Sequence, residues 1–252
     1  MTATNQQATA GEVQTVVAAR RLEHARSVFI GVGRPSTAAL LARMVHNPGL
    51  VLVYESGTIG AKPFHIPLSI GDGELAETAD TVVSVPEMFN YWIGPGRVEV
   101  AFLGAAQVDR FGNLNSTVIG DYDHPKTRLP GAGGAPEIAA CCQEVVVIAP
   151  HSPRTFVERL DFRTTVGYGH GPGDRERLGF RGRGPTAVVT DLGVLEPDPD
   201  TRALRLTQLH PGVQEDQVLK ATAWDLQVAA DLEHTPPPTD EELSALRELL
   251  SR

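Results

Sequence analysis

Apolar and polar residues follow one another in blocks over the first third of the chain, and the blocks predict two helix–strand pairs. Residues 11–26 are rich in alanine and free of proline, which favours a helix, and the apolar run 28–30 predicts a strand. A second helix begins near Pro35, a residue suited to the first helical turn, and ends before Asn-Pro-Gly at 47–49. Residues 50–54 are apolar throughout, as in a strand covered on both faces of a parallel sheet.

The same alternation continues along the rest of the chain. It predicts an α/β fold, an open and mostly parallel sheet with helices on both faces, in a single domain over residues 1–252. Further strands are expected at 98–103, 144–149, 187–190 and 203–209, and further helices at 135–142 and 215–221.

A last helix is indicated at the C-terminus. It follows three prolines at 236–238, and Thr239 with Glu242 has the spacing of a capping box. Its apolar stripe consists of Leu243, Leu246, Leu249 and Leu250.

Three segments lack a helical or strand period. Residues 61–97 and 109–134 are rich in Gly, Pro, Asp and Asn, and loops of that length in a compact domain are usually functional or covered by a partner. Residues 167–185 have the most linker-like composition of the chain, which predicts an exposed excursion from the domain.

Composition narrows the possible partners. A formal net charge of −9 without a dense basic cluster argues against nucleic acid and against an anionic membrane surface. An anionic substrate therefore needs local positive groups or backbone amides, from this chain or from another. No apolar run approaches the ~20 residues of a membrane span, and residues 1–14 show no signal peptide pattern. Cys141 and Cys142 are neighbours and provide no disulfide framework. We expect a cytoplasmic enzyme.

The first candidate for chemistry is Glu55, which directly follows the apolar run 50–54. Ligands of open α/β sheets bind at the carboxyl ends of the strands, where this carboxylate is expected. Gly57 and Gly60 leave room beside it for a ligand or for a second backbone. Partial shielding from water would make the carboxylate more nucleophilic or more basic. On spacing alone, a solvated glutamate at the start of a turn is the competing interpretation.

A second polar segment follows the strand expected at 98–103. Residues 109–112 (Asp-Arg-Phe-Gly) have the composition of a turn, which accounts for Asp and Gly there. A turn accounts less well for the hydrogen-bonding side chains gathered around it, Gln107, Asn113, Asn115 and Ser116. These side chains either stabilise the turn or orient a neighbouring carboxylate, and we expect a supporting role for Gln107, Asn113 and Asn115.

The third segment is the glycine-rich run before the helix expected at 135–142. Gly131, Gly133, Gly134 and Ala135 leave several backbone N–H groups free, and such groups suit an anion or an oxyanion. The spacing matches neither a dinucleotide-binding fingerprint nor a phosphate-binding P-loop. A plain loop is the competing interpretation.

Other kinds of site have no support in the sequence. The histidines, including His65, His124, His151 and His170, lack metal-ligand spacing, and no Gly-x-Ser-x-Gly motif is present. We therefore expect no metal and no organic cofactor. Residues 88–92 (Met-Phe-Asn-Tyr-Trp) form an apolar patch, either in the core or at an interface.

Together these segments resemble the β subunit of class I coenzyme A transferases, most closely the glutaconate CoA-transferase branch. The resemblance rests on residues 54–57 (Tyr-Glu-Ser-Gly), 104–116 and 131–135, and it continues into 190–194 and 209–213. The order and spacing of these motifs cover nearly the whole chain. Segment 104–116 is long and quite specific, whereas the other pieces are weak alone.

The resemblance implies roles for several residues. Glu55 matches the nucleophilic glutamate of the family, residues 131–135 lie near the acyl-CoA thioester, and an α subunit of similar fold completes a hetero-oligomer. Coenzyme A then enters as a substrate and not as a cofactor. The acetoacetate-using branch usually has Ser-Glu-Asn-Gly, so the order Tyr-Glu-Ser-Gly argues for the glutaconate-like branch and against an oxo-acid substrate.

Three other functions stay open at this point. The fold also suits an acyl-CoA hydrolase, a ring-opening enzyme or a decarboxylase, with Glu55 as a general base in the first two. The chain could instead be a non-catalytic subunit that shapes a site on its partner. The third is a sugar-phosphate isomerase-like protein in which Glu55 transfers a proton.

Overall fold

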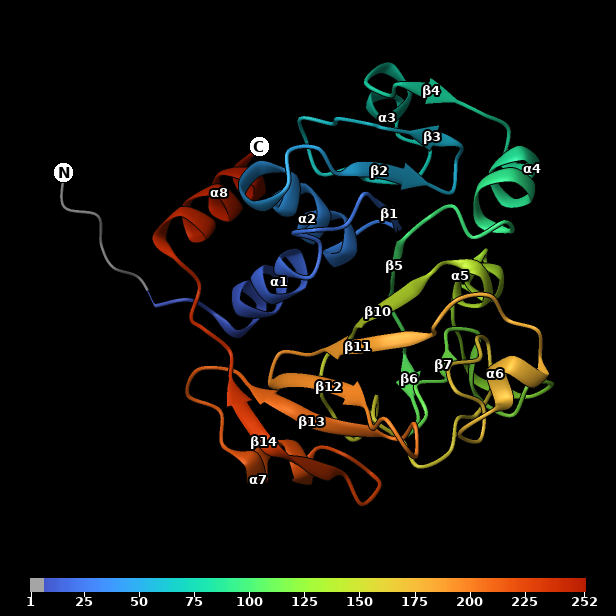
Figure 1. The fold of residues 1–252 in the computed structure, drawn as a ribbon, viewed down its shortest axis with the longest axis vertical. Helices are drawn as coiled ribbons and strands as arrows, with labels where there is room; N and C mark the ends of the chain where they lie inside the picture. The colour runs from blue at the N-terminus through green and yellow to red at the C-terminus, as the bar shows by residue number, and fades with distance from the viewer. Residues whose placement is uncertain (1–6) are drawn as a thin grey trace.

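The computed structural model describes residues 7–252 and is built around one ten-stranded sheet (Figure 1). Two separate two-stranded sheets pair β6 (Gln107–Val108) with β7 (Leu114–Asn115) and β8 (Val118–Gly120) with β9 (Pro125–Arg128). Across the large sheet the strands are β14 (Gln227–His234), β13 (Leu204–Leu209), β12 (Gly193–Pro197), β11 (Pro185–Val189), β10 (Glu144–Ile148), β5 (Val100–Leu103), β1 (Ser27–Ile30), β2 (Val51–Tyr54), β3 (Thr58–Ile59) and β4 (Thr81–Val82).

The centre of the sheet is parallel, and antiparallel pairs stand toward both edges. Strands β2, β1, β5, β10 and β11 are joined by parallel pairing. On one side β3 and β4 add antiparallel strands, and on the other β12 and β13 do so before β14 pairs in parallel with β13. The predicted open, mostly parallel sheet is confirmed.

Both faces of the sheet are buried, which explains the uninterrupted apolar runs of its central strands. In β2, Leu52 and Tyr54 belong to one core cluster and Val53 to the other, because successive side chains point to opposite faces. In β1, Val28 and Phe29 divide in the same way.

Helices cover each face of the sheet. One face carries α1 (Ala10–Arg20), α2 (Arg34–Leu41), the π-helix η1 (Ala42–His46) and α8 (Asp240–Ser251). Figure 1 shows α8 beside α1, although the two lie at opposite ends of the chain. The second face carries α5 (Ala135–Cys141) and the π-helix η2 (Met88–Ile93), which contact one another. The shorter helices are α3 (Gly73–Glu77), α4 (Val85–Glu87), α6 (Asp174–Arg177) and α7 (Glu215–Lys220).

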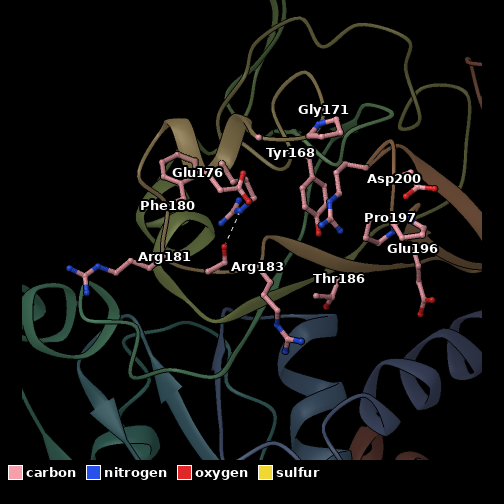
Figure 2. A pocket seen from close by; sticks show the side chains of 16 residues that line it. Tyr168, Gly171, Glu176, Phe180, Arg181, Arg183, Thr186, Glu196, Pro197 and Asp200 are labelled. Atoms are coloured by element: carbon pink, nitrogen blue, oxygen red, sulfur yellow. Dashed lines mark hydrogen bonds between the residues drawn. The ribbon is translucent and has the colours of Figure 1, made fainter.

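Residues 167–185 are exposed in part, as their composition predicts, and anchored in part. Arg175 of α6 is only 5% exposed, and its guanidinium donates to the carbonyl oxygens of Gly182, Gly167 and Ala139 at 2.8–3.0 Å. The buried cation thus ties the segment to the end of α5, while the segment's outer side borders a cavity of about 720 Å³ (Figure 2). The glycines and arginines that look linker-like in the sequence permit this close packing.

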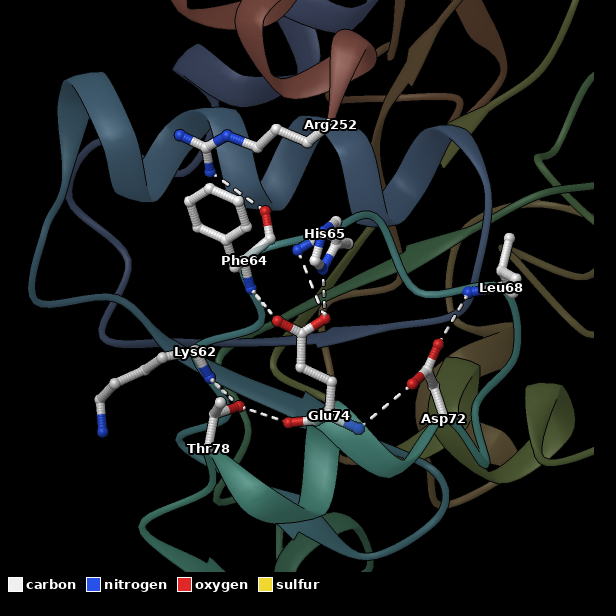
Figure 3. A network of polar contacts seen from close by, with 8 residues as sticks. All are labelled: Lys62, Phe64, His65, Leu68, Asp72, Glu74, Thr78 and Arg252. Carbon is white, nitrogen blue, oxygen red and sulfur yellow. Dashed lines mark hydrogen bonds and ion pairs between the residues drawn. The ribbon is translucent and has the colours of Figure 1, made fainter.

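Residues 61–97 are also more ordered than predicted, since they contain α3, β4, α4 and η2. Figure 3 shows how the first part is held: the Glu74 carboxylate accepts the backbone N–H of Phe64 at 2.6 Å and contacts the His65 ring at 3.2 Å. Asp72 caps α3 by accepting the N–H of Glu74. The second long loop, residues 109–134, contains β7, β8 and β9.

The C-terminal helix forms as predicted, with a complete capping box between Thr239 and Glu242. Leu246 and Leu249 are buried in the core, whereas Leu250, predicted in the same stripe, is 57% exposed. Within residues 7–252, no helix combines the length and the apolar character that crossing a membrane requires. The signal peptide prediction falls partly on residues 1–6, outside the described residues, and the cytoplasmic location stays a prediction.

Candidate active site

Glu55 lies in the turn between β2 and β3, at the carboxyl end of β2. The turn is closed by the N–H of Gly57, which donates to the Tyr54 carbonyl at 3.0 Å. Gly57 has a φ of +102°, and a Cβ there would lie 1.9 Å from the carbonyl oxygen of Val83. The sequence predicts that Gly57 and Gly60 make room for a ligand or for a second backbone. At Gly57 the neighbour is the backbone of Val83, whereas a Cβ on Gly60 would meet the Asp80 side chain.

The glycine-rich loop contacts the Glu55 carboxylate. A Cβ on residue 134 would lie 3.0 Å from Glu55 Oε1, and one on Gly133 would lie 3.9 Å from either carboxylate oxygen. Both glycines and Glu55 line a groove of about 490 Å³ between η2 and α5. The structure therefore brings together two candidate segments that are almost eighty residues apart in the sequence.

The Glu55 carboxylate has no hydrogen-bond donor and no ion-pair partner within residues 7–252. It is nevertheless half-buried. Next to it, the hydroxyl oxygens of Ser56 and Thr58 are buried and make no hydrogen bond to a described residue. Buried polar groups normally form hydrogen bonds, so it is unusual that Glu55, Ser56 and Thr58, which lie within four residues of one another, all have side-chain oxygens without a partner among the described residues.

Two hydrogen bonds hold the glycine loop at its start. Ser116 Oγ donates to the Gly131 carbonyl at 2.9 Å, and the Gly131 N–H donates to the Ser116 carbonyl at 2.9 Å. The loop then turns into α5, with Gly131 and Gly133 at positive φ values of 107° and 50°. Ala135 donates its N–H back to the Ala132 carbonyl, while the N–H groups of Gly133 and Gly134 have no partner in the described part of the chain.

Gln107 and Asn115 support the residues that hold this loop. Both are buried, and Asn115 Nδ2 donates to Gln107 Oε1 and to the Val118 carbonyl, each at 2.7 Å. The Asn115 side-chain oxygen accepts the N–H of Thr117 at 2.9 Å. Asn115 thereby fixes the backbone on both sides of Ser116, the residue bonded to Gly131. The side chains of Gln107 and Asn115 therefore act on the groove through the backbone around Ser116, and neither of them hydrogen-bonds to Glu55.

The Asn113 side chain contacts Asp109 and segment 167–185, and not the glycine loop. Its Nδ2 donates to Asp109 Oδ2 and to the Gly169 carbonyl, each at 2.8 Å, and its oxygen accepts the N–H groups of Gly167 and Gly169. Burial raises the pKa of Asp109, although the bond from Asn113 opposes this effect. Asn113 thus anchors the start of segment 167–185, and its supporting role at the candidate site stays a prediction.

The groove has further walls that the sequence did not single out for chemistry. Phe89 and Asn90 come from η2, and Glu137 and Cys141 come from α5. The Phe89 ring lies directly against Gly134, since a Cβ there would be 2.3 Å from Cζ of the ring. The apolar run 88–92 indicates a core or interface patch, but nothing in its sequence indicates a π-helix. This rare form of helix often occurs at functional sites.

No group of three His, Cys, Asp or Glu side chains within residues 7–252 is arranged to hold a metal ion. His151 is a buried residue of the core: burial lowers its pKa to about 4, and its ring contacts the hydroxyls of Thr190 and Thr222. That the protein needs no metal or cofactor stays a prediction.

Comparisons with known proteins agree with this geometry. The family model of the coenzyme A transferases matches residues 12–221. The chain is 56% identical to one of the subunits of 3-oxoadipate CoA-transferase from Pseudomonas knackmussii, over 96% of this chain and 93% of that protein. It is 36% identical to one of the subunits of glutaconate CoA-transferase from Acidaminococcus fermentans, over 90% of this chain and 86% of that protein.

The fold agrees as well. The crystal structure of glutaconate coenzyme A-transferase from Acidaminococcus fermentans superimposes with a TM-score of 0.90 and 34% identity, over 96% of this chain and 94% of that chain. A more distant relative, the IpdB component of the cholesterol ring-cleaving hydrolase of Rhodococcus jostii, is 30% identical over 86% of this chain and 81% of that protein. The resemblance seen in the sequence is confirmed, and the chain belongs to the coenzyme A transferase family.

Proposed function

We propose that this chain is the subunit carrying the nucleophile of an acyl-CoA:carboxylate CoA-transferase, and that the nucleophile is Glu55. One observation carries the proposal: the Glu55 carboxylate is held against Gly134 in an open groove with no partner of its own among the described residues. A carboxylate placed for structure would be hydrogen-bonded, whereas a nucleophile needs a free lone pair and a clear approach.

In the first half of the proposed reaction, a Glu55 oxygen attacks the thioester carbonyl of the acyl-CoA. The C–S bond breaks, which gives a mixed anhydride and coenzyme A thiolate. The thiolate then attacks the glutamyl carbonyl of the anhydride, so that the acyl group leaves as a free carboxylate and a glutamyl-CoA thioester remains. In the second half, another carboxylate runs the same steps in reverse. The covalent route divides one difficult exchange into easier steps.

The N–H groups of Gly133 and Gly134 supply the stabilisation that this chemistry needs. They have no partner in the described part of the chain, and they belong to two residues that lie beside the Glu55 carboxylate. Each tetrahedral intermediate carries negative charge on the former carbonyl oxygen, and removing one such donor typically costs ~3 kcal/mol. In a protein with a formal charge of −9, backbone amides provide this positive potential without a charged side chain.

The two closer relatives suggest the class of acid. Both are named for dicarboxylic acids, 3-oxoadipate and glutaconate, and we extend a dicarboxylic acyl-CoA to this chain. The relative named for 3-oxoadipate is the more similar of the two, at 56% identity. We therefore include an oxo acid among the candidate substrates, although the order Tyr-Glu-Ser-Gly at 54–57 argues against one.

We also propose an α subunit as the partner, because each of these two relatives is itself one subunit of a larger enzyme. The groove is open on its outer side, and exposed apolar side chains stand near its η2 wall, among them Val85 at 47% and Tyr91 at 61% exposure. A partner that covers this face would exclude water from the anhydride. The purified single chain is expected to be nearly inactive, and full turnover by this chain alone would contradict the proposed partner.

Steady-state kinetics with the partner subunit present test the transferase. With an acyl-CoA and a second carboxylic acid as substrates, the covalent route predicts double-displacement kinetics, with parallel lines in double-reciprocal plots. Hydrolysis should be slow and should not depend on the acceptor acid. Rapid acyl-CoA hydrolysis without an acceptor would replace the transferase with a hydrolase of the same fold, in which Glu55 activates water.

A further inference from the structure

The ring of Phe89 fills the space that a side chain on residue 134 would occupy, beside the Glu55 carboxylate. A Cβ on Gly134 would lie 2.3 Å from Cζ and 2.7 Å from Cε1 of the ring, and 3.0 Å from Glu55 Oε1. A water oxygen does not fit so close to two ring carbons, because non-bonded heavy atoms pack about 3.5–4.0 Å apart. The ring therefore keeps water out of the place where it meets the carboxylate.

The backbone before Phe89 is tied to the turn that carries Glu55. The Val83 N–H donates to the Gly57 carbonyl at 3.0 Å, and the missing Cβ of Gly57 lets the Val83 backbone approach this turn. Ser84 then caps α4, which runs directly into η2. The ring and the carboxylate thus come from two segments that are hydrogen-bonded to one another.

The π-helix η2 is anchored by residues other than Phe89. Met88 and Ile93, its first and last residues, are fully buried in the core, whereas Phe89 is only partly buried against the same core cluster. The Gly94 N–H donates to the Phe89 carbonyl at 2.8 Å, the i to i+5 hydrogen bond of a π-helix. A change of the Phe89 side chain therefore leaves the anchors of the helix in place.

Water competes with the acceptor acid for the glutamyl-CoA thioester of the proposed reaction. Water attack on the glutamyl carbonyl forms a C–O bond and breaks the C–S bond. Coenzyme A then leaves as the thiol with one proton of the water, the other proton passes to solvent, and the Glu55 carboxylate is regenerated. The thioester is lost without transfer, which is why enzymes exclude water from reactive intermediates.

We propose that Phe89 decides between transfer and hydrolysis: its ring keeps water from the glutamyl-CoA thioester, so that the thioester persists until an acceptor carboxylate arrives. This inference rests on the proposed function, since it requires the covalent route through Glu55. A phenyl ring suits the role because it has no donor or acceptor that would hold a water molecule beside the glutamyl carbonyl. The proposed partner covers the outer side of the groove, and Phe89 covers a flank that belongs to this chain.

The first test measures transfer and hydrolysis side by side in the enzyme assembled with its partner subunit. The ratio of hydrolysis to transfer should rise about tenfold in Phe89→Ala, and less in Phe89→Leu, which retains apolar bulk. Phe180→Ala is the matched control and should keep the wild-type ratio. Phe180 is also partly buried, but it lines the separate cavity beside α6, where its ring lies 5.1 Å from the Arg175 guanidinium.

The ratio separates shielding from a purely structural role. A structural role predicts that Phe89→Ala loses transfer and hydrolysis equally, and an unchanged ratio would overturn the proposal. Phe89→Leu gives the same comparison if Phe89→Ala does not assemble with the partner, because a branched aliphatic side chain still packs against the core cluster. A ratio for Phe89→Leu equal to that of wild type would then overturn the proposal.

The lifetime of the intermediate measures water access without an acceptor acid. The assembled enzyme is loaded with acyl-CoA, freed of small molecules by gel filtration and placed in water enriched in heavy oxygen. The CoA mass on the Glu55 peptide should decay about tenfold faster in Phe89→Ala than in wild type, and one heavy oxygen should enter Glu55. Equal decay rates in an enzyme whose wild type forms the adduct and transfers CoA would reject the role of Phe89 alone. Absence of both adduct and transfer in wild type would reject the proposed function, and this inference with it.

Discussion

Two partly or fully buried glutamates that lie far apart in the sequence, Glu55 and Glu242, differ in what surrounds their carboxylates. Glu242 is 2% exposed, and Arg20 donates to both of its oxygens at 2.7 Å. The Thr239 N–H donates to it at 2.7 Å, and the His46 ring lies 3.1 Å away. Burial alone would raise the pKa of Glu242, but the hydrogen bonds from Arg20 and Thr239 outweigh burial and lower it. Glu55, half-buried, has none of these partners.

The difference shows which local features separate a structural carboxylate from the one that we propose to be reactive. Around Glu242 both oxygens accept hydrogen bonds, two from Arg20 and one from the Thr239 N–H, and the group joins α8 to α1. Around Glu55 the neighbours are Gly134 and the Phe89 ring, which shield the carboxylate without bonding to it. The first arrangement stabilises the fold, and the second leaves an anion available for attack.

The largest expected effect comes from Glu55→Gln. It retains the shape of the side chain but removes the anionic nucleophile, so CoA transfer should fall by more than about 1000-fold while acyl-CoA binding changes little. Glu55→Asp should also be poor, because the carboxylate retracts by about an ångström from atoms that must meet near ~3 Å. The assay follows CoA exchange between two acids. Wild-type exchange by Glu55→Gln would move the nucleophile to the partner.

A smaller loss of turnover is expected from Gly134→Ala. The added Cβ would lie 2.3 Å from the Phe89 ring and 3.0 Å from Glu55 Oε1, so the loop or the carboxylate must shift. A misplacement of about 1 Å at the reacting atoms typically costs about 100-fold in rate. Gly73→Ala is the control, because its Cβ meets no atom within 4 Å. Equal kcat values for the two variants would show that the contact does not matter for the reaction.

Glu242→Gln should have the opposite profile from Glu55→Gln. It leaves the Arg20 guanidinium without its anionic partner, and we expect the free energy of unfolding to fall by about 2 kcal/mol, less than for a fully buried pair because Arg20 is 24% exposed. Specific activity of the folded enzyme should stay near that of wild type. Urea denaturation measures the first quantity. A stable but inactive Glu242→Gln variant would remove the contrast between the two glutamates.

The smallest effect concerns the second ion pair between the chain ends, Glu12 with Arg247 at 2.7 Å. The hydrogen bond from Arg247 lowers the pKa of Glu12 from 4.5 to about 2. A lowered pKa contributes stability that is present above 4.5 and is lost as pH falls toward 2. Glu12→Gln should cost about 1 kcal/mol at neutral pH and should flatten the acid side of the stability profile. If the free energy of unfolding fell equally with pH in wild type and in Glu12→Gln below pH 5, this assignment would be contradicted.

The sheet could be predicted from the sequence because its signals are local. The apolar run at 50–54 requires burial on both faces, and this requirement fixes β2 and the place of Glu55 at its carboxyl end. The capping box at Thr239 is equally local. The glycines at 131–134 indicate free amides, but their contact with Glu55 depends on pairing between distant strands, which a single sequence does not reveal.

The features that escaped prediction depend on long-range packing. A π-helix differs from an α-helix by one hydrogen-bond step, so residues 88–93 carry no pattern that distinguishes it. The position of Phe89 over Gly134 follows from that helix. Arg175 lies in a segment of glycines and charges. Its burial becomes favourable only when the folded segment brings the carbonyl groups of Gly167 and Gly182, and that of Ala139 in α5, around the guanidinium. Leu250 follows the helical period but lies beyond the surface that α8 covers.

Mass spectrometry of the covalent intermediate tests the central claim most directly. The enzyme, assembled with its partner subunit, is incubated with acyl-CoA without an acceptor acid and is then digested to peptides. The proposed chemistry predicts the mass of coenzyme A, less one water, on the peptide that carries Glu55, and no such mass in Glu55→Gln. An unmodified Glu55 peptide in an enzyme that exchanges CoA at full rate, or an adduct on a peptide of the partner subunit, would contradict it.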